Sequence, residues 1–110
     1  MRTKQRYLLV ETSNEVHEIH AFTEQLYKGI IEISGQLGYH KINPKVIEFA
    51  GNNLFIIKAS LSGVGELIRA LTFLKKVGNS EVAFFTLRSS GTLRALREHA
   101  SLLGKITVRL

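Results

Sequence analysis

The sequence contains no cysteine, and it has few of the features that direct a chain to a membrane. Without cysteine, disulfide bonds, cysteine-ligated zinc and thiol catalysis are excluded. No apolar run approaches the ~20 residues that a membrane-spanning helix needs. Glu11 interrupts Leu8–Val10 before it forms the apolar core of a signal peptide. We therefore expect a soluble protein of a reducing, cytoplasmic compartment.

Residues arranged for catalysis or metal binding are also scarce. His17 and His20 share one side of an expected helix, but no third ligand accompanies them. His40 and His99 are isolated in the sequence. Gly63–Gly65 is too short for a dinucleotide-binding fingerprint, and no nucleotide-binding lysine motif occurs. The sequence predicts a binding protein with neither a catalytic site nor a cofactor of its own.

The aromatic signature of RNA-recognition modules is missing. The expected strand Leu54–Lys58 holds one aromatic residue, Phe55, and lacks the basic-glycine-aromatic pattern. Tyr7, Phe55, Phe84 and Phe85 are therefore interpreted as core or interface residues rather than as platforms for bases. If the protein binds RNA, stacking on the sheet is not the expected means.

Positive charge is what the sequence has in excess. Fifteen lysine and arginine residues against nine acidic residues give a net charge of +6, which favours a polyanionic partner such as nucleic acid. The charge gathers at the two ends of the chain, because residues 1–10 hold three basic groups and no acid, and residues 86–110 hold five against Glu98. The six acidic residues between positions 11 and 50 are expected at solvated positions. A fold that joins the two ends would form one basic face.

The first half of the chain predicts a strand, a long helix and two further strands within a single domain of residues 1–110. Tyr7–Glu11 is the first strand, and Thr12–Glu15 supplies residues typical of a helix start. The apolar stripe of the first helix consists of Ile19, Phe22, Leu26, Ile30, Ile33 and Leu37. Gly29 and Gly35 predict a break or kink near its end. Gly38–His40 is the expected end of this helix.

The next segment predicts a hairpin and a second helix. Val46–Phe49 and Leu54–Lys58 are the strands, joined by the turn Gly51–Asn53. The second helix has Ser62 as a plausible cap and an apolar stripe of Val64, Leu67, Ile68, Leu71 and Leu74. Its last turn is expected to include Lys75 and Lys76, and Gly78-Asn79 to stop it.

A fourth strand, Val82–Phe85, then precedes a third helix that Gly104 is expected to end. The apolar stripe of this helix is Leu93, Leu96, Ala100 and Leu103. Ile106–Leu110 alternates like a short final strand. The order β-α-β-β-α-β-α, with this final strand, predicts an α+β fold: a ferredoxin-like, RNA-recognition-like two-layer sandwich. The third helix is expected at an edge or over the other sheet face.

The turn between the fourth strand and the third helix is the best candidate site. Its hydroxyls, glycine and flanking arginines, beside the free N–H groups of a helix start, make a good anion site. Ser90 or Thr92 serves equally well as a plain helix cap. On the helix, Arg94 and Arg97 share one side. The candidate RNA-binding residues are Arg2, Lys4, Arg6, Arg88, Ser90, Gly91, Thr92, Arg94, Arg97 and Lys105.

Four segments together resemble one known family. They are Arg6–Leu8, Asn43–Phe49, Phe55–Lys58 with the helix Gly65–Lys76, and Thr86–Arg97, whose Ser-Gly-Thr turn and basic helix are the most specific part. The chain is similar in these segments to the Pop-five protein subunit of archaeal and eukaryotic ribonuclease P, which is related to the Rpp-fourteen subunit. The likeness covers nearly the whole chain.

This resemblance implies a noncatalytic accessory subunit. In the family, the RNA subunit performs the metal-dependent hydrolysis that removes the 5′ leader of precursor tRNA, so magnesium is expected with the RNA and not on this chain. The protein pairs with a TIM-barrel protein subunit, commonly in a two-plus-two heterotetramer built around a pair of the small subunits. Ser90, Gly91, Thr92, Arg94 and Arg97 match the family's turn and helix.

The sequence departs from the family pattern at two places. Lys58 stands where arginine is common, which argues against a bidentate phosphate contact there. The chain also lacks a long C-terminal tail, so Leu102–Leu110 is expected to pack locally or to meet a partner.

Two other functions fit the same fold. A ferredoxin-like small-molecule-sensing regulatory domain would use Ser62–Gly65 as its ligand turn. A small hydrolase would need a catalytic set that the sequence does not offer.

Overall fold

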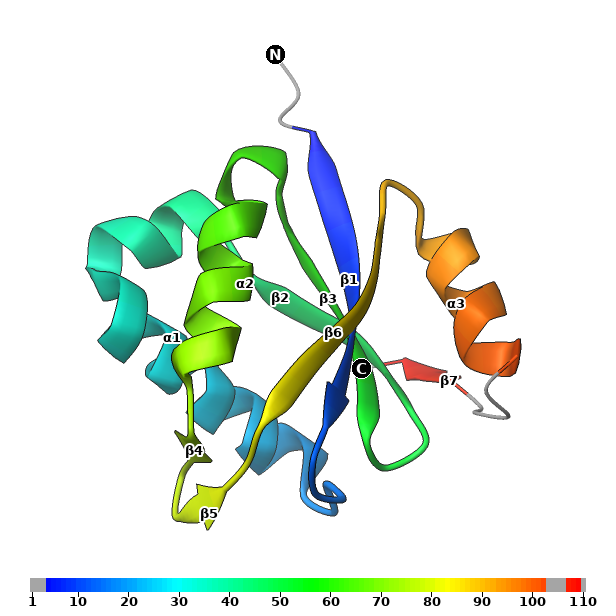
Figure 1. Cartoon of the computed structure of the whole chain (residues 1–110), viewed down its shortest axis with the longest axis horizontal. Coiled ribbons are helices and arrows are strands. Elements are labelled where there is room, and N and C mark those ends of the chain that lie inside the picture. The colour runs from blue at the N-terminus through cyan, green and yellow to red at the C-terminus, as the bar shows by residue number, and fades with distance from the viewer. Residues whose placement is uncertain (1–3, 103–106, 110) are drawn as a thin grey trace.

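The computed structural model describes residues 4–102 and the backbone of residues 107–109. Figure 1 shows the strands and helices along the chain. They are β1 (Gln5–Thr12), α1 (Ile19–Ile42), β2 (Lys45–Ala50), β3 (Leu54–Ser60), the short 3-10 helix η1 (Leu61–Gly63), α2 (Val64–Phe73), β4 (Lys76–Val77), β5 (Ser80–Glu81), β6 (Phe84–Ser90), α3 (Leu93–Leu102) and β7 (Thr107–Arg109). None of the helices in these residues is long and apolar enough to cross a membrane.

Five strands form one antiparallel sheet in the order β6-β1-β3-β2-β7. The first four stand in the order of the split βαβ, ferredoxin-like arrangement, which confirms the predicted fold class. β7 pairs with β2, with Val108 opposite Phe49, so the predicted final strand is confirmed over Thr107–Arg109. The other residues expected in that strand, Ile106 and Leu110, lie outside the described residues.

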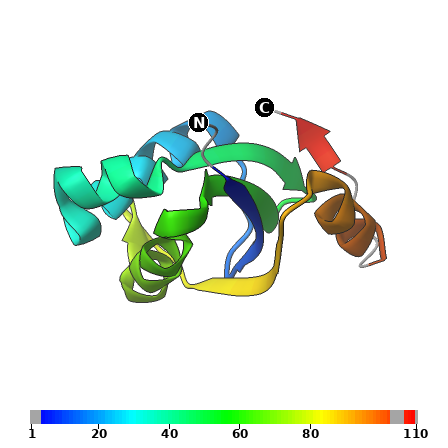
Figure 2. The same ribbon diagram turned by 90° about the horizontal axis from the view of Figure 1, so that it is seen from above.

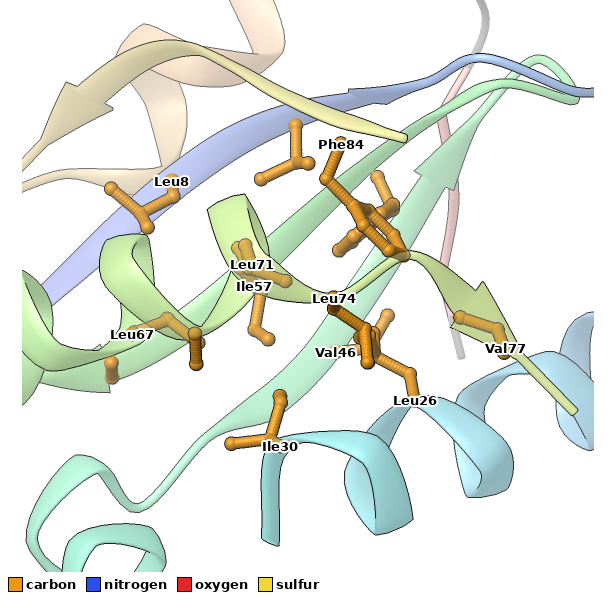
Figure 3. Close-up of a cluster of buried hydrophobic side chains, with 14 of the residues drawn as sticks. Leu8, Leu26, Ile30, Val46, Ile57, Leu67, Leu71, Leu74, Val77 and Phe84 are labelled. Atoms are coloured by element: carbon orange, nitrogen blue, oxygen red, sulfur yellow. The ribbon is translucent and has the colours of Figure 1, made fainter. Parts of the chain in front are cut away.

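The larger core lies between the sheet and the two helices α1 and α2. Even-numbered residues of β1, such as Leu8 and Val10, face this core because successive strand residues point to opposite faces. Figure 3 shows Leu67 and Leu71 of α2 and Leu26 of α1 converging on the sheet. A group of aromatic rings closes one end of this core, with centroids between 5.6 and 6.2 Å apart: Phe22, Phe49, Phe55 and Phe84.

The opposite face of the sheet is covered by α3. Leu9 of β1 and Ile56 of β3 pack there against Leu96 and Ala100 of the helix, and all four are fully buried. Figure 2 shows α3 well apart from α1 and α2. The predicted two-layer sandwich therefore gains a third layer over part of the sheet, which settles the placement of the third helix.

The kink predicted in α1 is confirmed at Gly35, whose φ of 74° and ψ of 172° are not helical. The predicted end at Gly38–His40 is wrong, because the helix resumes and runs to Ile42, where Asn43 caps it in the left-handed conformation. Leu37 lies beyond the kink and is 88% exposed, so it does not belong to the buried stripe. Because the helix changes direction at Gly35, the side chain of Leu37 does not reach the core.

The polar run after β1 does not start α1. The helix begins at Ile19, and Glu18 in the N-cap position makes no side-chain cap. Ser13 and Asn14 instead hold a distant loop, since Ser13 Oγ accepts the N–H of Ala83 at 2.9 Å and Asn14 Nδ2 donates to the carbonyl of Glu81 at 2.5 Å. Ser13 and Asn14 do form hydrogen bonds, but their partners are in the segment before β6 rather than at the start of α1.

The segment between α2 and β6 also differs from its prediction. α2 ends at Phe73, Leu74 is extended, and Lys76–Val77 pairs with Ser80–Glu81 as a small hairpin around Gly78, whose φ is 62°. Lys75 and Lys76 therefore do not lie in a last helical turn. Ser62 lies in η1 and forms no side-chain cap.

The fourth sheet strand, β6, is displaced along the chain from its predicted position. It runs from Phe84 to Ser90 rather than over Val82–Phe85. Of the aromatic residues assigned to the core or an interface, Phe55 and Phe84 are buried and Phe85 is 51% exposed.

Gly63, at the end of η1, and Gly65, in the first turn of α2, give a matched test of packing. A Cβ at Gly63 would lie 2.5 Å from the Cα of Ile42, whereas one at Gly65 would meet nothing within 4 Å. We expect Gly63→Ala to destabilise the fold by about 1–3 kcal/mol, since backbone must move. Gly65→Ala should stabilise it by about 0.5–1 kcal/mol because alanine favours a helix. Urea unfolding measures both, and equal stabilities would contradict this close approach.

Candidate nucleic-acid interface

Two hydroxyl side chains build the turn between β6 and α3. Ser90, the last residue of β6, accepts the N–H of Thr92 at 3.1 Å through its Oγ. Thr92 stands directly before α3, and its Oγ1 accepts the N–H of Ala95 at 3.4 Å. This is the geometry of an N-cap, so Thr92 is the cap and Ser90 closes the turn that precedes it.

The cap leaves room for a negatively charged ligand. A helix has no internal carbonyl partner for its first N–H groups, and Thr92 takes up only that of Ala95. The N–H groups of Leu93 and Arg94 begin the same ten-residue helix, at its partially positive end. Capping and anion binding are therefore compatible at this turn.

Arg6 reaches this turn from the other end of the chain. β1 and β6 are antiparallel neighbours, with Tyr7 opposite Ser90, so Arg6 comes next to Gly91. A Cβ at position 91 would lie 3.3 Å from Arg6 Nη1. Glycine at this position lets the guanidinium group lie against the turn. The fold thus brings the basic N-terminal segment beside the basic C-terminal segment at Arg6 and Gly91, which the charge distribution left open.

Arg94 adds a second cation in the first turn of α3. Its side chain is 90% exposed and pairs with Glu98 four residues later, with Arg94 Nε 3.2 Å from Glu98 Oε1. An exposed pair of this kind is weak and screened by salt. Arg94 can therefore exchange Glu98 for a phosphate at little cost.

Arg97 has a different role, because its guanidinium group is bound to Glu48 of β2. Arg97 Nε donates to both carboxylate oxygens, at 2.9 and 3.1 Å, and Nη2 also contacts Glu48. These hydrogen bonds raise the pKa of Arg97 above its ordinary value. The prediction that the acidic residues of the first half are solvated is wrong for Glu48, which is fully buried because α3 covers its strand. Arg97 holds α3 on the sheet, one turn beyond the candidate anion site.

Of the remaining predicted RNA-binding residues, Arg88 belongs to β6 and Lys4 precedes β1, and two others are not described. Arg88 is exposed, and its Nη1 lies 3.4 Å from His99 Nδ1 on α3. Lys4 is exposed just before β1, and its carbonyl accepts the N–H of Leu61. Arg2 and Lys105 lie outside the described residues. The structure therefore brings together five of the predicted residues: Arg6, Ser90, Gly91, Thr92 and Arg94.

In the competing ligand turn Ser62–Gly65, the backbone at Gly63 is closed off by the end of α1, whereas Ser62 and Gly65 are exposed. Gly63 is buried against the backbone of Lys41 and Ile42, so the end of α1 fills the space in front of it. Among the described residues, no three histidine or acidic side chains gather where they could hold a metal ion.

Sequence reasoning missed two partners of the basic residues, Glu48 and His99. A signal for Glu48 was present, since it is one charge within the apolar strand Val46–Phe49. On a strand with one solvated face such a charge needs no partner. The contact with Arg97 depends on the placement of α3 over that face, which no local pattern reveals.

The ion pair gives a test that separates the two arginines. Arg97→Ala leaves the buried carboxylate of Glu48 without this partner, so we expect the melting temperature to fall by about 10 °C. Arg94→Ala removes only an exposed pair and should leave the melting temperature nearly unchanged. Thermal unfolding followed by circular dichroism measures both, and equal melting temperatures would contradict the assignment.

Comparison with known proteins places these features in a family. The sequence profile of the Rpp14/Pop5 family matches residues 6–101. Ribonuclease P protein component 2 of Sulfurisphaera tokodaii is 31% identical over 90 residues, which cover 81% of this chain and 72% of that protein. A chain in the cryo-EM structure of yeast ribonuclease MRP has the same fold, with a TM-score of 0.66 and 8% identity over 94% of this chain and 96% of that one. The profile match spans β1 through the turn and most of α3, and this protein is a member of the Rpp14/Pop5 family.

Proposed function

We propose that this protein is an accessory RNA-binding subunit of ribonuclease P, which supports the catalytic RNA in removing the 5′ leader from precursor tRNA. Family membership and the relative named as a ribonuclease P protein component support this function. The observation that carries the RNA-binding role is the approach of Arg6 to Gly91 beside the capped start of α3.

The turn offers a phosphate group two kinds of donor, backbone N–H groups and guanidinium groups. The N–H groups of Leu93 and Arg94 begin a helix, and the guanidinium groups of Arg6 and Arg94 add positive charge from two sides. Contacts of this kind position a nucleic acid without reading its bases. They suit a subunit that supports an RNA whose own groups perform the reaction.

The position of α3 over one face of the sheet also supports RNA binding through phosphate contacts rather than base stacking. RNA-recognition modules stack bases on the exposed face of their sheet. In this protein α3 packs on that face, and Phe49, Phe55 and Phe84 belong to the core on the other side. RNA is therefore proposed to contact the turn and the start of α3.

The partners proposed for this function are ribonuclease P RNA, precursor tRNA and a TIM-barrel ribonuclease P protein subunit. A two-plus-two heterotetramer that contains a pair of this chain, magnesium bound with the RNA and a cytoplasmic location belong to the same proposal. Similarity to a chain of the ribonuclease MRP structure supports the fold of such a subunit.

Reconstitution of precursor-tRNA cleavage tests the function. The cognate RNA and TIM-barrel subunit are assayed with and without this chain at moderate magnesium. We expect omission of the chain to lower the cleavage rate at least about tenfold, which corresponds to roughly 1.4 kcal/mol of activation free energy. Equal rates with and without the chain would exclude an accessory role.

The salt dependence of RNA binding tests the site. Replacing Arg6 and Arg94 with alanine should weaken binding, because fewer counterions are released when fewer phosphates are neutralised. The slope of log K against log salt should become shallower by about 1 for each phosphate that the variant no longer neutralises. Arg69→Ala is the matched control, since Arg69 is an exposed arginine on α2, paired there with Glu66. An unchanged slope in the double variant would place the phosphate contacts elsewhere.

A further inference from the structure

A second surface feature lies beside the small hairpin of β4 and β5. A cavity of about 320 Å³ opens between this hairpin, the first turns of α1 and the loop that joins β1 to α1. We call it the hairpin pocket. Its apolar lining consists of Val16, Ala21, Phe22, Val77 and Val82. Figure 1 shows β4 and β5 beside the start of α1, at the opposite end of the molecule from the turn that precedes α3.

The loop that borders the hairpin pocket is held on both sides. Ser13 N–H donates to the carbonyl of Ala83 at 2.9 Å, and Asn14 Nδ2 donates to that of Glu81. Val16 N–H donates to the carbonyl of Asn52 in the β2–β3 turn at 2.6 Å. A partner would therefore meet a pocket already formed, and binding would not have to order the loop.

Charge at the pocket has one sign. Glu15 and Glu18 line it, Glu15 is 67% exposed on its side chain, and no lysine or arginine is among the described lining residues. His17 lines it as well, with Nε2 3.7 Å from Glu15 Oε2. On a protein with a net charge of +6, the described lining of this pocket is an acidic exception. Two carboxylates around an apolar hollow fit a cationic group attached to an apolar one.

We propose that the hairpin pocket docks a protein partner, whose apolar side chain enters the cavity while flanking lysine or arginine residues pair with Glu15 and Glu18. RNA is a poor occupant, because its phosphates would face these carboxylates. The adjoining hollow shares Asn14 and Val82 with the pocket and is lined by Lys75, Lys76 and Glu81. An acidic residue of the same partner segment would pair there with one of the two lysines.

The test rests on the proposed function, because its probe is the purified cognate TIM-barrel subunit. Calorimetry measures the affinity of that subunit for the chain and its variants. We expect Glu15→Gln/Glu18→Gln to weaken binding about tenfold and to reduce its salt dependence. Ala21→Trp should also weaken it about tenfold by filling the pocket, since Ala21 lines the cavity at an exposed position that tolerates a larger side chain. The control Glu24→Gln/Glu32→Gln removes two charges of α1 outside the pocket lining and should bind normally.

Each alternative occupant gives a distinct result. Wild-type affinity in both pocket variants, or no binding of the subunit by the wild-type chain, overturns the proposal. A loss of RNA affinity or of self-association in the pocket variants, with subunit binding unchanged, assigns the pocket to RNA or to a second copy and also overturns it. The cleavage assay separates the two proposals: if cleavage still depends on the chain while both pocket variants bind the subunit normally, the docking site fails and the proposed function stands.

Discussion

The contact between Glu48 and Arg97 is the constraint on which the far side of the sheet depends. A carboxylate that is removed from water is stable only with a partner that replaces its hydration. Arg97 supplies such a partner, and in doing so it ties α3 to the middle of β2. The apolar contacts under α3 are few, with Leu96 and Ala100 as its buried members. The ion pair therefore fixes which face of the helix turns inward, and with it the direction in which Arg94 projects.

The turn before α3 depends on a second constraint, which is topological. The ferredoxin-like order places the first and last long strands side by side and antiparallel, so the beginning of β1 meets the end of β6. Two basic segments separated by most of the chain thereby become neighbours. Gly91 completes the arrangement, because a larger residue there would crowd the guanidinium group of Arg6. The two basic segments form one local positive region here because β1 pairs with β6.

Sequence patterns predicted the elements that depend on local periodicity. The apolar stripes located all three helices, and Gly35 located the kink in α1. Features decided by distant contacts were missed for a common reason. Ser13 and Asn14 have the chemistry of helix caps, yet their partners are Ala83 and Glu81, which no local pattern reveals. For the site, Thr92 and Arg6 were recognised as candidates, whereas the assignment of Arg97 needed the position of α3. An arginine on a helix face looks the same in sequence whether it meets solvent or a buried carboxylate.

The separation of the hairpin pocket from the turn at α3 has a consequence for how a complex is built. The two sites lie at opposite ends of the molecule, on elements that share the central sheet but no side chains. The contacts proposed for RNA and those proposed for a protein partner therefore use different residues and would not compete for the same surface. Under the two proposals, assembly through this chain would have no obligatory order: a protein bound first and an RNA bound first would lead to the same ternary complex. The chain would then act as an adaptor, with the central sheet setting the distance between the two partners.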